Sequence, residues 1–234
     1  MTRVQGGNIN TQLNTFGPAS NITGRAAQAP EVGTQVQQAL FGKAKPPLLD
    51  AAQFPQLAAQ LKLLGKFKRK LASMAGDDDD DYSIALADST IAMIDEDGTI
   101  FVGAGFLHAC RDEPAVMVGV LAHEIGHRPK RWKSYRTRRQ LSREELEMLC
   151  RHEETRADIF AGKALAEMQL ACEPLAAFLV AIESGPHPDY FPAEVRAQVI
   201  RDAHAGRSYR ARARRSLFPD FDRMTAPKGH LGEY

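Results

Sequence analysis

The sequence His123-Glu124-Ile125-Gly126-His127 places two imidazoles four residues apart, with a carboxylate directly after the first. On a helix, a step of four residues brings both side chains to one face, about 6 Å apart. Two rings at that separation can bind one tetrahedral metal ion, and Glu124 is then expected to face the water on that ion. The pattern is typical of zinc hydrolases, whereas the structural alternative is a pair of core histidines.

The residues before the motif predict the helix that such a site needs. Asp112 is a suitable N-cap, Pro114 suits the first turn, and the apolar run 115–122 leads directly into His123. Pro129 is expected to end this helix. Burial of the helix would protect the histidines from competing water.

A second long helical pattern, running from Ser142 to Cys172, contains the candidate third ligand. Glu154 falls within its apolar stripe, and a carboxylate that faces the interior is costly unless it is paired or bound to a metal. Glu153 and Glu147 are the competing ligand candidates. The structural alternative is a surface glutamate paired with a neighbouring arginine.

The segment Glu154-Thr155-Arg156-Ala157-Asp158 resembles the E-x-x-A-D pattern that follows H-E-x-x-H in gluzincin metallopeptidases of the HtpX and CAAX-prenyl-protease type. This resemblance covers about residues 50 to 200. It implies one Zn²⁺ per chain, held by His123, His127 and Glu154. It also implies that Glu124 is the general base and that Asp158 accepts the N–H of a ligand histidine. The implied activity is that of a zinc-dependent endopeptidase acting on a protein or peptide substrate.

The expected fold is α+β and zincin-like, mostly helical with a small three-stranded sheet over the motif helix. Short strand patterns occur at residues 82–86, 90–94 and 99–102, and the turn Asp97-Gly98 precedes the last of them. In the family that the chain resembles, the edge strand of such a sheet holds an extended substrate by main-chain hydrogen bonds.

Downstream, Gly185-Pro186-His187-Pro188 and the helical stretch 193–203 resemble the histidine-proline element and closing helix of the family, with Arg196 in place of the usual arginine. The spacing from His187 to Arg196 is longer than in the family. His187 is a candidate catalytic residue, and His187 or Tyr190 is expected to help stabilise an oxyanion. The alternative for His187 is a turn histidine.

Composition predicts one catalytic domain, flanked by irregular ends. The 234 residues are 44% hydrophobic, and a net charge of +1 argues against general nucleic-acid binding. Residues 1–45 are polar and expected to be largely disordered, residues 46–216 to form the metallopeptidase domain, and residues 217–234 to form an irregular tail that could cover the cleft. The three cysteines form no C-x-x-C pattern, which favours buried thiols in a reducing compartment.

No run of roughly 20 apolar residues predicts a membrane span, although the best-known family members are membrane proteins. No signal-peptide pattern occurs, so the chain is expected to be cytoplasmic, or exported without a cleavable signal peptide. The polar N-terminus is similar in composition to exported bacterial effectors. The alternative function is a zinc-stabilised binding or chaperone-like protein with little turnover.

Charged segments lie on both sides of the motif. Asp77 to Asp81 is an acidic run, residues 130–139 form a basic loop that contains the only tryptophan, Trp132, and residues 207–215 are also basic. Solvated loops are expected at the first two, with Trp132 anchored on the core, and a nucleic-acid or acidic-substrate patch is the alternative for the basic loop. A helical pattern also covers Leu48 to Met74.

Overall fold

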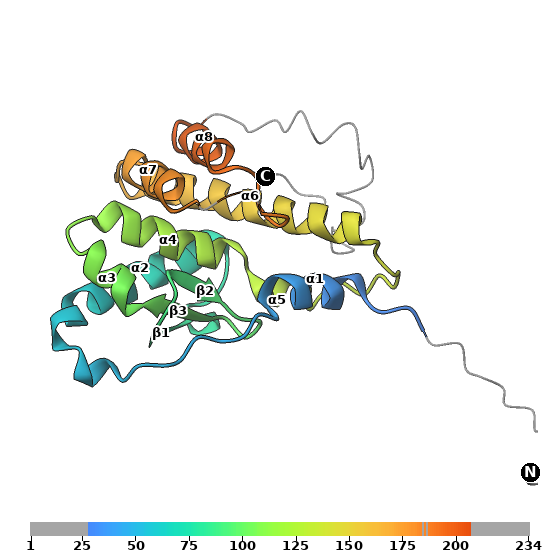
Figure 1. The fold of residues 1–234 in the computed structure, drawn as a ribbon, viewed down its shortest axis with the longest axis horizontal. Coiled ribbons are helices and arrows are strands. Elements are labelled where there is room, and N and C mark those ends of the chain that lie inside the picture. Colours follow the sequence, from blue (N-terminus) through green and yellow to red (C-terminus); the bar gives the residue numbers. More distant parts are fainter. Residues whose placement is uncertain (1–27, 184, 186, 207–234) are drawn as a thin grey trace, which may run out of the picture.

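The structure is a computed structural model that describes residues 28–183, 185 and 187–206. This part of the chain is mostly helical and contains one three-stranded sheet (Figure 1). In chain order the elements, with η for a 3-10 helix, are α1 (Val32–Phe41), η1 (Ala51–Gln53), η2 (Pro55–Leu57), α2 (Ala58–Ala75), η3 (Asp79–Asp81), β1 (Ser83–Ala87), β2 (Ala92–Ile94), β3 (Thr99–Gly103), α3 (Ala104–Ala109), α4 (Pro114–Gly126), α5 (Pro129–Trp132), α6 (Arg143–Glu167), α7 (Glu173–Ile182) and α8 (Ala193–His204).

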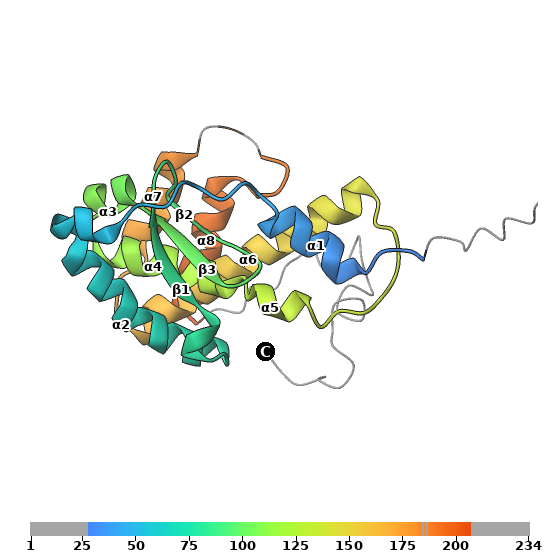
Figure 2. The same ribbon diagram turned by 90° about the horizontal axis from the view of Figure 1, so that it is seen from below.

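The sheet has the strand order β1-β3-β2, with β1 parallel and β2 antiparallel to the central strand β3. α4 covers one face, and the segment 42–50 crosses the other face on its way from α1 to η1 (Figures 1 and 2). Leu48 in that segment forms an isolated bridge with Ala87 at the end of β1. The predicted small sheet over the motif helix is therefore confirmed.

The helix α4 is the centre of the core because it has neighbours on several sides. It contacts α2 and β2 below and α6 and α7 above (Figure 1). Val116, Val118, Leu121 and Ile125 are all buried. Full burial of each such side chain stabilises the fold by roughly 1.5–3 kcal/mol, so the motif helix is fixed by its apolar neighbours.

Two glycines allow α6 to approach its neighbours closely. A Cβ on Gly126 would lie 2.9 Å from the Cα of Ala157, so α4 and α6 meet almost backbone to backbone just after the motif. On the other side of α6, a Cβ on Gly162 would lie 2.5 Å from the carbonyl oxygen of Ile200 in α8. The register of α6 is thus fixed between α4 and α8, and this register places the α6 carboxylates beside the motif.

Several predicted boundaries need correction. The N-cap of α4 is Glu113 rather than Asp112. Pro129 does not stop α4, which ends at Gly126. Instead it begins the short helix α5, after Arg128 has turned the chain in the left-handed conformation with φ of 45°. α6 ends at Glu167 instead of continuing to Cys172.

The prediction that residues 1–45 lack regular structure is wrong for α1. Val32, Val36 and Phe41 of this helix are buried, and α1 contacts α5 and α6. Their spacing of four and five residues gives a short apolar face, which the glutamine-rich composition obscures. The folded part therefore begins before residue 46. Residues 1–27, the basic segment 207–215 and the predicted tail 217–234 lie outside the described residues.

The pattern over Leu48 to Met74 forms a helix only in its second half. Residues 51–57 form the short turns η1 and η2, and Pro55 occupies the first position of η2. α2 follows and ends at Gly76, whose φ of 72° suits a residue without a side chain. In the described part of the chain, no helix is long and apolar enough to cross a membrane.

The acidic run and the basic loop pair with other residues rather than facing only solvent. Asp77 binds Arg128, and Asp81 lies 2.6 Å from Lys130. Trp132 is 1% exposed, as expected for an anchor on the core, and its indole N–H donates to Glu153. These pairs fix the chain that leaves the motif helix.

Candidate metal centre

His123, His127 and Glu154 come together at the contact between α4 and α6. Nε2 of His123 lies 3.2 Å from Oε2 of Glu154, and Nε2 of His127 lies 3.7 Å from Oε1. All three donor atoms lie within 4.8 Å of one another. Donors bound tetrahedrally to zinc at about 2.0–2.1 Å are about 3.3–3.5 Å apart, so this group could hold a metal ion with small adjustments.

Two buried atoms of the group, Nδ1 of His127 and Oε2 of Glu154, lack a hydrogen-bond partner among the described residues. Oε2 of Glu154 is buried and has no hydrogen-bond partner in the described part of the protein, although His123 and Arg196 lie within ion-pair distance. An unsatisfied buried carboxylate oxygen is costly, and a metal ion would satisfy it. Two imidazoles and one carboxylate form a ligand set that zinc accepts.

Asp158, one turn after Glu154, fixes the first histidine from behind. Its Oδ1 lies 2.9 Å from Nδ1 of His123, so that nitrogen can donate while Nε2 faces the other donors. Arg196 of α8 binds the same carboxylate through Nε at 2.8 Å and Nη2 at 3.0 Å. Burial alone would raise the pKa of Asp158, but Arg196 and His123 outweigh it and hold that pKa below its usual value.

The two histidines differ in protonation. Burial, which outweighs the charge of Glu154, lowers the pKa of His127 to about 4, so this ring is neutral at physiological pH. Burial also acts against protonation of His123, but Asp158, which faces its Nδ1, and the adjacent carboxylate of Glu154 raise the pKa to about 10. A metal ion binds the neutral imidazole and must therefore displace a proton from His123.

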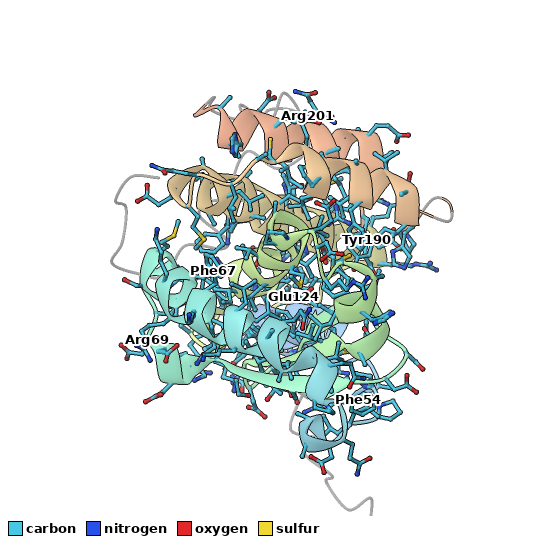
Figure 3. All side chains as sticks on the ribbon, turned by 90° about the vertical axis from the view of Figure 1, so that its left-hand side faces the viewer. Phe54, Phe67, Arg69, Glu124, Tyr190 and Arg201 are labelled. Carbon is cyan, nitrogen blue, oxygen red and sulfur yellow. The ribbon has the colours of Figure 1, made fainter. Side chains whose placement is uncertain are left out.

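Glu124 is a buried carboxylate without a partner. It is 8% exposed and forms no hydrogen bond or ion pair with the described residues. Burial raises its pKa to about 7, despite the opposing charge of His123. Figure 3 shows Glu124 in the interior behind α2, below Tyr190. A carboxylate with a pKa near neutrality is suited to accept and return a proton.

The competing ligand candidates lie elsewhere. Glu153 binds Arg131, Trp132 and Arg156, the last at 2.8 Å. Glu147 accepts from Nε of Arg143 at 2.8 Å on the outer surface of α6. The register of α6 therefore places Glu154, rather than Glu153 or Glu147, beside the two histidines.

His187 does not join the donors. Its side chain is 49% exposed, and it forms no hydrogen bond, ion pair or ring contact with them. Its ring instead lies 4.9 Å from that of Tyr190, and Tyr190 lies 4.8 Å from the guanidinium of Arg196. Burial and the nearby charges of the site carboxylates raise the pKa of Tyr190, so its hydroxyl stays protonated.

Two residues from the N-terminal segment also border the site, and the sequence did not reveal them. The Phe41 ring lies 5.9 Å from that of His127 in an edge-to-face contact. Nζ of Lys43 lies 5.8 Å from the centre of the Tyr190 ring. The apolar spacing of α1 could have located Phe41, but no pattern marks Lys43.

The edge strand β2 has no described strand on its outer side and contacts α4, which carries His123 and is capped by His127. Ile91 and Asp95 bond to β3 through their main chain. Because antiparallel residues alternate in direction, the main-chain groups of Ala92 and Ile94 point away from β3. No main-chain hydrogen bond from another described segment closes this edge.

Comparisons with protein-family models, curated proteins and solved structures found no match for this chain.

Replacing Asp158 by Ala is expected to weaken zinc affinity roughly 10- to 100-fold, because the orienting partner of His123 is lost while all three donors remain. Asn should have a milder effect, since its amide oxygen can still accept the N–H. Competition with a chelating dye measures the affinity. Glu173→Ala, which breaks a surface carboxylate–arginine pair with Arg201, is the control. Unchanged affinity in Asp158→Ala would contradict the orienting role.

Proposed function

We propose that this protein is a zinc-dependent endopeptidase with a zincin-like arrangement, related to the HtpX and CAAX-prenyl-protease type of gluzincin. The observation that carries the proposal is Glu124, a buried and unpaired carboxylate directly after the first histidine of a His-His-Glu group. A purely structural metal site has no need of such a group. A hydrolase needs it as a base.

A zinc ion held by His123, His127 and Glu154 would supply Lewis-acid chemistry, polarising the substrate carbonyl and lowering the pKa of water. Glu124 accepts the proton of the attacking water and then delivers it to the leaving amine. Asp158 and Arg196 keep His123 in one orientation during this cycle, because they hold its ring from the side opposite the donors. The buried position of Glu124 keeps its pKa in the range that proton transfer in both directions requires.

The open edge of β2 supports an extended peptide as the substrate. The outward main-chain groups of Ala92 can pair with a peptide strand, as in other cases of strand addition, whereas Ile94 is only 3% exposed, so its main chain would first have to be uncovered. β2 lies against the motif helix, so a peptide bound there would run beside the metal centre. Main-chain pairing is independent of side chains, which favours an endopeptidase that accepts varied sequences.

A second class of function remains, namely a zinc-stabilised binding or chaperone-like protein with little turnover. The same open edge of β2 supports this alternative, because strand addition can serve binding alone. Incubation of the purified protein with a peptide library, followed by mass spectrometry, separates the two. The proposal predicts new peptide termini that a chelator prevents. Retained but intact peptides would support the binding protein instead.

Replacing Tyr190 by Phe is expected to lower kcat roughly 100- to 1000-fold with little change in zinc content. The reason is the loss of one hydroxyl donor to the oxyanion, since the hydroxyl of Tyr190 has no hydrogen bond to the described residues. Steady-state kinetics on a short peptide checks this. Tyr135→Phe, at a buried tyrosine beside Trp132, is the matched control. If Tyr190→Phe and the wild type have equal kcat, the hydroxyl does not stabilise the oxyanion and Tyr190 serves only in packing.

A further inference from the structure

Lys43 brings a positive charge to the candidate metal centre from the N-terminal segment. The contact of Phe41 with His127, at the end of α1, anchors the backbone beside one of the three donors. Two residues later, Nζ of Lys43 lies 5.8 Å from the centre of the Tyr190 ring. The guanidinium of Arg196, which binds Asp158, also lies near this ring, at 4.8 Å from its centre. Lys43 therefore borders the same site as the catalytic candidates.

The ammonium of Lys43 is free to bind an anion. It is exposed and forms no ion pair or hydrogen bond with any described residue. Two other cations, Lys45 and Arg196, already have carboxylate partners. Lys45 lies 2.6 Å from Asp95, and Arg196 donates two hydrogen bonds to Asp158.

The charge balance of the site indicates what Lys43 binds. Glu124, Glu154 and Asp158 contribute three carboxylates, and Arg196, which pairs with Glu154 and Asp158, contributes one positive charge. The two charges of a bound zinc ion would complete the balance, so the ammonium of Lys43 would leave the rim of the site positive and attract an anionic group. Lysine forms charge-assisted hydrogen bonds with carboxylates, and the carboxylate is the ordinary anionic group of a peptide.

We propose that Lys43 binds a carboxylate of the substrate, so that the protein selects peptides carrying a negative charge near the bond that it cleaves. This inference rests on the proposed peptidase function and names its substrate class. The carboxylate has two sources, the C-terminus of a short peptide or the side chain of an internal Asp or Glu. The same ammonium can bind either, and the peptides used in the test distinguish them.

The test uses one peptide sequence in matched forms and two readouts. One pair differs only in a free or an amidated C-terminus, and a second pair, with both termini blocked, differs only in an internal Asp or Asn. Values of kcat/KM are measured with the zinc-loaded wild type. Binding is measured by fluorescence anisotropy with zinc-loaded Glu124→Gln, in which peptides stay intact. The acidic form of at least one pair should be preferred roughly 10- to 100-fold in both readouts, the range of a hydrogen bond to a charged group.

The variants of Lys43 connect this preference to one ammonium. Lys43→Met should abolish it, Lys43→Arg should retain most of it, and Lys43→Glu should reverse it. Because the side chain is exposed, these changes should leave folding intact, which the zinc content and melting temperature check. Lys66→Met on the exposed surface of α2 is the control and should keep the preference.

The outcomes separate this inference from the proposed function. Cleavage or binding that is equal for acidic and neutral forms would overturn the role of Lys43, and so would a preference that survives in Lys43→Met. Absence of all cleavage, together with a binding preference that Lys43→Met abolishes, would overturn the peptidase function but support the carboxylate site.

Discussion

Glu124→Gln is expected to lose peptide cleavage, with kcat falling roughly 100- to 10,000-fold, while zinc content and melting temperature stay near wild type. Gln has nearly the same volume and cannot accept a proton from water. Glu124 is buried without a hydrogen bond to the described residues, so no structural contact is lost with its charge. Burial also raises its pKa to about 7, and the neutral amide avoids the cost of burying a charge.

Single-turnover kinetics with a cleavable peptide measures the rate, and metal analysis measures zinc in the same preparations. Glu167→Gln, at an exposed position near the end of α6, controls for the loss of one negative charge. Its kcat should equal that of the wild type. If Glu124→Gln cleaves as fast as the wild type, Glu124 is not the base and the mechanism is wrong.

Glu154→Gln is expected to reduce zinc content from one ion per chain to a small fraction. A neutral amide is a poor zinc ligand beside two imidazoles, and the group then has only two good donors. The carboxylate of Glu154 also lies between the two rings, at 3.2 Å from His123 and 3.7 Å from His127, so no other described acid can replace it without moving α6.

Zinc content after dialysis against a weak chelator measures this loss. The matched controls are Glu153→Gln and Glu147→Gln, at the two other glutamates that the sequence offered as ligands. Glu153 is held by Arg131 and Trp132, and Glu147 by Arg143, so both variants should keep their zinc. Full occupancy in Glu154→Gln, or loss of zinc in Glu153→Gln, would show that the third ligand has been assigned to the wrong residue.

Much of the site could be predicted because it depends on local spacing. The four-residue step from His123 to His127 needs only a helix, and the apolar residues before it define that helix. Glu154 could be separated from Glu153 because its position in the apolar stripe of α6 predicts that it faces the motif helix, whereas Glu153, which is also buried, faces Arg131 and Trp132. The small sheet could be predicted from its short β-branched runs and from the turn at Gly98.

The remainder depends on contacts between distant segments. The close approach of Gly126 to Ala157 sets the distance between α4 and α6. Nothing about this glycine or this alanine in the sequence predicts that contact. Phe41 and Lys43 reach the site because α1 packs on α5 and α6, which a polar composition concealed. The resemblance to a histidine-proline element makes His187 a candidate beside Tyr190, with a turn histidine as the alternative. In the fold, it is Tyr190 that lies against Arg196.

The partners of the charged loops also depend on contacts between distant segments, which the sequence does not reveal. An acidic run and a basic loop each resemble solvated segments when read alone. In the fold, Asp77 and Asp81 meet Arg128 and Lys130 after the motif helix, and they hold the chain that leaves it. Such pairing between segments about 50 residues apart follows from the tertiary structure.

The most direct test of the central claim is a zinc titration of the metal-free protein, with peptide cleavage measured at each step. The claim is that one zinc ion, held by His123, His127 and Glu154, makes this chain a peptidase. It predicts no cleavage without metal, and a rate that rises in proportion to added zinc and reaches its maximum at one equivalent. Cleavage that persists in the metal-free protein, or tight binding of one equivalent of zinc that produces no cleavage of any peptide in the library, would contradict it.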